Sequence, residues 1–530
     1  MLIVERGARN LIGGKFWRGM AAASLAGLLL AGCGDSGAER QKQAGEIAKG
    51  VEDYLALIEV PSQPIRIRHD KVTVTPAEDG KGYLVAITGL RYGTDKQAMA
   101  TFGEIDYRLT PEGEDQFQVS DLKTPKEVAF ASQDGKPEAV VKFETTAFTA
   151  TWSKALQNFL KFDWQVKDIV AVNTAENATG SGEILKIASA AMTGDGKENG
   201  KGLLDQVSKI TVNGLSGTDP MDGTTIKLDK ISGNVSVEKL DFPAYRQMME
   251  KLNAFSAKYA PTVAVGTSAP PPPELTEEDR KGLADVVRGF PKVMSAYGYD
   301  FSAEGLTVTD AQGNVTVHLT QGGMGFGLKG IDTDKAQANF NIKHDGLTVN
   351  DPAFQDPMAK AVLPKSGNLD LVAIDLPVAT MVEGIAQALP ELTSADPQVA
   401  QGAQFMMMGA MMSALSKSTI KLKIDPSAIE TDKARLSADG ELKLAMETPQ
   451  KAVGVVNFAL LGLDDLMALA KGMAEQSPDA MQAMGMLQML QTLAERETGA
   501  DGKPVDKFKV DLTEAGAVLV NGKPLDGVSP

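Results

Sequence analysis

The sequence predicts an α+β protein, mostly antiparallel curved β-sheet with packed helices, in two similar halves. Short runs in which apolar and polar residues alternate recur along the chain, as is typical of half-buried strands. A proline-rich segment at 260–275 interrupts these runs and predicts a stiff linker. The runs on its two sides resemble each other, which indicates a diverged duplication.

The beginning of the chain has the pattern of a secretory signal. Four basic residues lie within the first eighteen positions, and a charge-free stretch follows from Gly19 to Cys33. A basic region followed by a short apolar run of small residues is typical of such signals. The run is shorter than the roughly 20 apolar residues that a membrane-spanning helix needs. We therefore predict that residues 1–32 are a signal peptide.

Cys33 is the only cysteine among 530 residues and ends this run. The sequence Leu30-Ala31-Gly32-Cys33 resembles the lipobox of bacterial lipoproteins. That resemblance implies a diacylglyceryl group on the Cys33 thiol, with Cys33 as the new N-terminus. Gly34 in place of Asp at the next position favours the outer membrane over the inner membrane. The alternative is an incidental cysteine in an ordinary cleavable signal.

Composition narrows the possible functions. The net charge of -16 repels nucleic acids and anionic membrane surfaces, and an aromatic content of 5% leaves few rings for base stacking. With Cys33 acylated, the chain has no thiol for a disulfide, a nucleophile or a zinc–thiolate site. We expect no nucleic-acid partner and attachment to the membrane through the lipid on Cys33.

The N-terminal half is expected to contain a tether, a helix and then strands. Residues 33–49 are polar and rich in Ala, Glu and Gln, which predicts a flexible tether. Val51–Val60 has the spacing of a short amphipathic helix. Alternating runs such as "YLVAITGL" from Tyr83 predict that 50–259 is a β-rich half.

The C-terminal half, 276–530, begins after four consecutive prolines. Thr276 with Asp279 three residues later is typical of a helix N-terminus. Strand patterns follow, and two runs of helical spacing predict a helical hairpin at about 463–495.

The two halves share a local pattern. Each has a Thr-Val-Thr strand, a turn with Gly, a second strand, a Gly-Leu pair and a Thr-Asp-Lys triplet, at Thr94–Lys96 and Thr333–Lys335. Chance similarity between β-rich sequences is the alternative to duplication. Another Thr-Asp-Lys at Thr431–Lys433 leaves open a smaller repeating hairpin unit.

No catalytic or metal motif stands out. His69, His318 and His344 are far apart in sequence and are expected to be solvated, and there is no His-Glu-x-x-His. The loop "GDGKENGKG" from Gly194 lacks the spacing of a phosphate-binding loop, and no Gly-x-Ser-x-Gly nominates a nucleophilic serine. We expect no catalytic residue, no cofactor and no metal.

Methionines gather in two apolar segments. Met406 and Met411 belong to the first, Met484 and Met489 to the second. Packing in helices is one interpretation, and copper(I) ligation through thioethers is another. Flexible methionine surfaces also adapt to varied apolar partners, so these four residues are the predicted lining of an apolar groove that could hold an acyl chain.

The linker, the "GLTV" turns at Gly305 and Gly346, the helical hairpin and the final "VDLTEAGAVLVNGKPL" resemble an uncharacterised proteobacterial periplasmic family, the domain of unknown function 2125 family. The resemblance covers mainly Thr276 to Leu525. It implies a β-rich envelope protein and carries no activity or active residues.

These observations predict a non-enzymatic, lipid-anchored periplasmic protein that binds an apolar ligand, such as a lipid, or an envelope protein partner. An envelope hydrolase whose site is not visible in the sequence is one alternative. A purely structural scaffold is another.

The Cys33→Ala change tests the anchor. We expect it to abolish labelling by radioactive palmitate and to release the protein from the membrane fraction, because the acylated thiol is lost. Membrane association that persists in Cys33→Ala would contradict the lipoprotein prediction.

Overall fold

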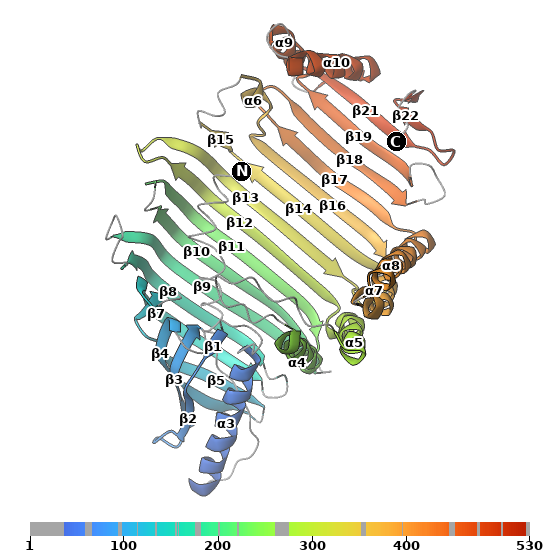
Figure 1. Cartoon of the computed structure of the whole chain (residues 1–530). Coiled ribbons are helices and arrows are strands. Elements are labelled where there is room, and N and C mark those ends of the chain that lie inside the picture. Colours follow the sequence, from blue (N-terminus) through green and yellow to red (C-terminus); the bar gives the residue numbers. More distant parts are fainter. Residues whose placement is uncertain are drawn as a thin grey trace. The chain divides into compact units, whose positions relative to one another are not determined.

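Figure 1 draws the computed structural model. The chain divides into two compact units. Unit 1 comprises Met1–Ser295 and Ile385–Phe405, and unit 2 comprises Ala296–Gly384 and Met406–Pro530. The structure describes residues 37–58, 66–93, 98–113, 115–132, 135–153, 156, 158–174, 182–199, 202–219, 222–259, 275–350, 357–394, 396–444, 451–473, 478–499 and 502–525. The predicted signal peptide, Cys33 and nearly all of the proline-rich segment lie outside these residues.

Unit 1 contains a long antiparallel sheet. Its strands are β1 (Arg66–Arg68), β2 (Lys71–Pro76), β3 (Tyr83–Gly93), β4 (Ala98–Glu112), β5 (Gln116–Lys123), β6 (Glu127–Ala131), β7 (Pro137–Ser153), β8 (Asn158–Asn173), β9 (Glu183–Glu198), β10 (Leu204–Thr218) and β11 (Thr225–Leu240). β3 pairs with β1 and β2 along one edge and with β4 along the other. β5 and β6 bridge β4 to β7, and β7 to β11 then pair in sequence order.

Helix α3 (Gly37–Ile58) covers the first strands of this sheet. One stripe of the helix is buried, and Ala44, Ile47, Val51 and Leu55 form it at the spacing of an amphipathic helix. It packs on strand residues such as Ile87. The prediction of a flexible tether through Lys49 is therefore wrong beyond Gly37, because the polar composition concealed this apolar stripe.

Helices α4 (Phe242–Tyr259) and α5 (Glu277–Val293) follow β11. The predicted start of α5 is confirmed, since the Thr276 side chain accepts a hydrogen bond from the Asp279 backbone N–H at 3.2 Å. The residues after α5 are tied to β11, because the Ser295 N–H donates to the Glu238 carbonyl. The division between the units thus follows Ser295, and α5 belongs to unit 1.

The strands of unit 2 are also antiparallel. Its strands are β12 (Ala296–Thr309), β13 (Val315–Lys329), β14 (Ala336–Asp345), β15 (Thr348–Val349), β16 (Ser366–Leu376), β17 (Lys421–Glu430), β18 (Arg435–Leu444), β19 (Ala452–Leu461), β20 (Glu495–Thr498), β21 (Pro504–Leu512), β22 (Val518–Val520) and β23 (Lys523–Pro524). The main order is β12-β13-β14-β16-β17-β18-β19-β21. Short strands flank it, with β15 on β13, β20 and β22 on β21, and β23 on β22.

Helices stand at the ends of these strands. α6 (Pro357–Val362), α9 (Leu463–Met473) and α10 (Pro478–Leu493) belong to unit 2, while α7 (Val378–Leu392) and α8 (Pro397–Lys417) contribute to both units. The predicted helical hairpin at about 463–495 is confirmed by α9 and α10. Arg496 bonds Asp464 on α9 and the buried Asp506 on β21, which fastens the hairpin to the sheet.

The Thr-Asp-Lys triplets are turns between strands. The Lys335 N–H donates to the Thr333 hydroxyl at 3.2 Å between β13 and β14. The Lys433 N–H donates to the Thr431 hydroxyl at the same distance between β17 and β18. The triplet at Thr94–Lys96 lies outside the described residues.

The prediction of an α+β protein with mostly antiparallel sheet is confirmed. No helix within the described part of the chain combines the length and apolar character needed to cross a membrane.

The Tyr107→Phe change tests the core beneath α3. Tyr107 is buried, its hydroxyl has no hydrogen-bond partner among the described residues, and burial raises the pKa of the phenol well above its ordinary value. A buried hydroxyl without a partner is costly, so we expect the free energy of unfolding to rise by about 1 kcal/mol. The free energy of unfolding would be measured by urea titration, with tryptophan fluorescence as the signal. Tyr83→Phe, which removes a hydrogen bond to Gln43, is the control and should lower stability.

A pH dependence follows from Asp279 on α5. Hydrogen bonds from Lys258, Thr276 and Tyr259 hold the pKa of its carboxyl well below the usual range. The carboxylate therefore stabilises the fold above the unfolded pKa of about 3.9, and this stabilisation is lost as the pH falls through the folded value. Urea midpoints of the wild type and Asp279→Asn should differ at pH 7 and converge toward pH 2. If the difference between the two urea midpoints were the same at pH 7 and near pH 2, the stabilising role of the Asp279 carboxylate would be contradicted.

Candidate functional site

The sheet of unit 2 has one apolar face. In antiparallel strands, directly opposite residues lie on the same face, and successive residues alternate between faces. One row of cross-strand neighbours runs through Tyr299, Phe326, Phe340, Leu371, Ile424, Gly440, Val456 and Val510. The sheet therefore presents an apolar row from β12 to β21.

Two further rows lie on the same face. One consists of Tyr297, Leu328, Ala338, Ala373, Leu422, Leu442, Gly454 and Leu512. The other, on β12 to β16, consists of Phe301, Met324, Ile342 and Leu369. We call these three rows the apolar face. The opposite face is polar, as in the row Asp300, Gly325, Asn341, Asp370 and Asp425.

Much of the apolar face is open. Six of its large side chains are 37–45% exposed, namely Tyr297, Phe301, Met324, Ile342, Leu369 and Leu422. Ile429 and Leu436 extend the exposed surface on β17 and β18. Since an aromatic side chain carries about 150–250 Å² of surface and an aliphatic one less, these eight leave at most roughly 500–800 Å² of apolar area open. The largest apolar patch of a typical monomer is about 300–600 Å².

The α9–α10 hairpin covers only the far end of this sheet. Leu487, Leu490 and Leu493 of α10 pack on a cluster that includes Phe508 of β21. Figure 1 shows both helices at the ends of β19 and β21. The open part of the apolar face therefore extends from β12 to β18.

Aromatic side chains gather at the β12 side of the apolar face. Tyr299 lies 6.3 Å from Tyr297 and 6.0 Å from Phe326 between ring centroids. Farther along, a Cβ at Gly440 would lie 2.4 Å from the Val455 carbonyl oxygen, so the close approach of β18 and β19 requires glycine there. The apolar face thus has aromatic side chains at β12 and a glycine without a side chain at β18.

The four predicted methionines form two separate pairs. Met406 and Met411 lie on α8, which precedes the Lys421 end of β17. Met484 and Met489 lie on α10, beside the end of the sheet where Glu430 of β17 pairs with β18. A strand of this length spans about 33 Å, so the structure does not bring the pairs into one groove. Met406 and Met489 are exposed, whereas Met411 and Met484 are half-buried.

The sequence reasoning missed the residues of the apolar face. A signal was present, because Tyr297, Tyr299 and Phe301 alternate with small or polar residues. That pattern indicates one apolar face on one strand. It does not show that Met324, Ile342 and Leu369, which come from other strands, continue the same row.

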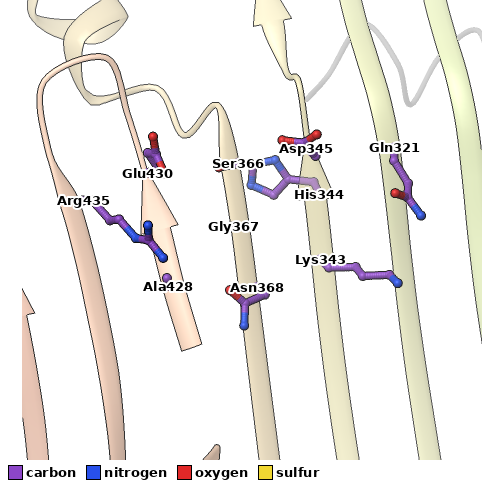
Figure 2. A pocket seen from close by; sticks show the side chains of 10 residues that line it. All are labelled: Gln321, Lys343, His344, Asp345, Ser366, Gly367, Asn368, Ala428, Glu430 and Arg435. Carbon is purple, nitrogen blue, oxygen red and sulfur yellow. The ribbon is translucent and has the colours of Figure 1, made fainter. Parts of the chain in front are cut away.

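A small pocket lies between the middle of β13 and the adjoining ends of β14, β16, β17 and β18 (Figure 2). Its volume is about 240 Å³, and its charged residues are Lys343, Asp345, Glu430 and Arg435. Both signs of charge are present, so the pocket suits a small polar molecule more than an apolar one.

The pocket also gathers Ser366, His344 and Asp345. No hydrogen bond within the described residues joins Ser366 to His344, and His344 Nδ1 is buried without a partner. The imidazole lies over Gly367, whose Cβ would come 3.1 Å from His344 Nε2. Asp345 is adjacent to His344 on a strand, so the two side chains leave on opposite faces. The three groups are therefore not connected as a hydrolytic triad.

The other residues considered in the sequence analysis are the histidines and Cys33. His69 bonds Glu52 at 2.7 Å and is not solvated as expected, and His318 Nδ1 contacts the Thr307 hydroxyl at 3.3 Å. Across the described ranges, no group of three or more His, Cys, Asp or Glu side chains is placed to hold a metal ion. Cys33 lies outside these ranges.

No family model matches the chain, and no curated protein or solved structure matches it. The lipoprotein assignment and the family resemblance therefore remain predictions from the sequence.

Proposed function

We propose that the chain is a non-enzymatic, lipid-anchored protein of the bacterial periplasm that binds an apolar ligand on the apolar face of unit 2. The observation that carries this proposal is the open apolar area from β12 to β18. Leaving such an area in water is unfavourable, and an apolar ligand would remove it from water.

The anchor and the location are inferred from the sequence. A lipid on Cys33 would hold the chain at a membrane, and Gly34 favours the outer membrane. Attachment at one end leaves the apolar face close to a source of apolar molecules, which supports the binding proposal.

A duplication would explain a similarity between the two predicted halves of the chain. In each half a helix precedes successive antiparallel strands: α3 comes before β1 to β4, and α5, which belongs to unit 1, comes before β12, β13 and β14. This shared order supports two similar halves. The Thr-Asp-Lys turns support the smaller hairpin unit equally well.

Hydrolysis at the pocket is the second candidate, because Ser366, His344 and Asp345 lie there together. Turnover would require His344 to rotate toward Ser366, since no hydrogen bond joins them. The geometry favours binding over hydrolysis.

Mass spectrometry of bound compounds tests the proposed function. The chain from Gly34 onward, which contains every described residue, would be produced in a bacterium and purified without detergent. We expect solvent extracts to contain an apolar compound in amounts comparable to the protein. Protein that carries no apolar compound and binds no anilinonaphthalene sulfonate would contradict the proposal.

An ester hydrolysis assay separates the two candidates. We expect no turnover by the wild type and none by Ser366→Ala. Turnover by the wild type that Ser366→Ala abolishes would establish the hydrolase and overturn the non-enzymatic assignment.

A further inference from the structure

We propose that the apolar face of unit 2 holds a long hydrocarbon chain, the acyl chain of an envelope amphiphile, laid across strands β12 to β18. This inference rests on the proposed function and names the class of its ligand. It is argued from the chemistry, the area and the dimensions of the face.

The chemistry of the face suits hydrocarbon. Its three rows contain no Asp, Glu, Lys, Arg or His, and the hydroxyls of Tyr297 and Tyr299 are their only polar side-chain groups. Tyrosine pairs an apolar ring with a polar tip, so the β12 side can meet the polar end of an amphiphile. The other residues of the three rows offer dispersion contacts alone. The next row on this face, which contains Ile429 and Leu436, also contains His344.

A protein partner fits this surface poorly. Protein interfaces carry about one hydrogen bond per 100–200 Å², so an area of roughly 500–800 Å² would need several. The two tyrosine hydroxyls are too few to supply them. The open area also reaches at most the roughly 800 Å² per partner of a standard interface, which makes a second copy of this chain a marginal occupant.

The dimensions suit an acyl chain. Adjacent strands lie about 4.8 Å apart, so the open face from β12 to β18 is about 24 Å across. An acyl chain that fills one leaflet of a bilayer spans about 15 Å, half of the hydrocarbon thickness. One chain can therefore lie along a row, between the aromatic residues of β12 and the hairpin that covers β19.

Chain length is the variable that tests this inference. Equilibrium dialysis of the chain from Gly34 onward would measure binding of tritiated octanoate, dodecanoate and hexadecanoate. Each methylene that leaves water should tighten binding about two- to fourfold, so hexadecanoate should bind at least about 100-fold more tightly than octanoate.

Two matched variants test where on the protein the acyl chain binds. Ile342→Glu introduces a charge into the exposed centre of the apolar face and should weaken hexadecanoate binding more than about tenfold. Gln337→Glu introduces the same charge on the same strand, on the polar face opposite Lys329, and should leave binding unchanged. Circular dichroism confirms that both variants fold.

Three outcomes would overturn the inference, and they differ from failure of the proposed function. Equal affinity for octanoate and hexadecanoate, while anilinonaphthalene sulfonate still binds, would leave an apolar site that does not take acyl chains. If Ile342→Glu and Gln337→Glu weakened hexadecanoate binding equally, the acyl chain would bind at another place on the protein. A dimer in light scattering that Ile342→Glu dissociates would assign the face to a second copy.

Discussion

The strict alternation of side chains along antiparallel strands is the constraint on which this structure depends. In unit 1 it aligns Val166, Ala190, Val212 and Ile231 across four neighbouring strands. In unit 2 it aligns Tyr299, Phe326 and Phe340 in the same way. The strands of each unit therefore have an apolar face, and any part of it that other elements do not cover is exposed to water.

Helices cover these faces only in part. In unit 1, α3 lies on the first strands, and the cluster beneath it includes Trp152 with a ring centroid 5.9 Å from that of Tyr54. In unit 2, the α9–α10 hairpin packs on the ends of β19 and β21, and the Arg496 ion pairs fasten it there. The strands from β12 to β18 have half-exposed side chains instead. The binding proposal follows from this incomplete cover, and no single reactive residue carries it.

The sequence predicted secondary structure better than the arrangement of its elements. Helical spacing was sufficient to place α9 and α10, and the pairing of Thr276 with Asp279 located the start of α5, because these signals lie within a few residues. The helix predicted from Val51 overlaps the second part of α3, but the first part, from Gly37, was missed because its apolar residues are embedded in polar ones. The methionines of α8 and α10 were predicted to share a groove. Their composition is alike, but strand β17 separates the two helices.

By itself the sequence determined the alternation of each strand, the helices with clear apolar spacing and the single cysteine at the end of an apolar run. All of these are properties of residues that are neighbours in the chain. Only the tertiary structure decided that Phe301, Met324, Ile342 and Leu369 form one row and that this row remains open. The physical reason is register, because a shift of one residue in any pairing would turn a whole strand's apolar side chains to the opposite face.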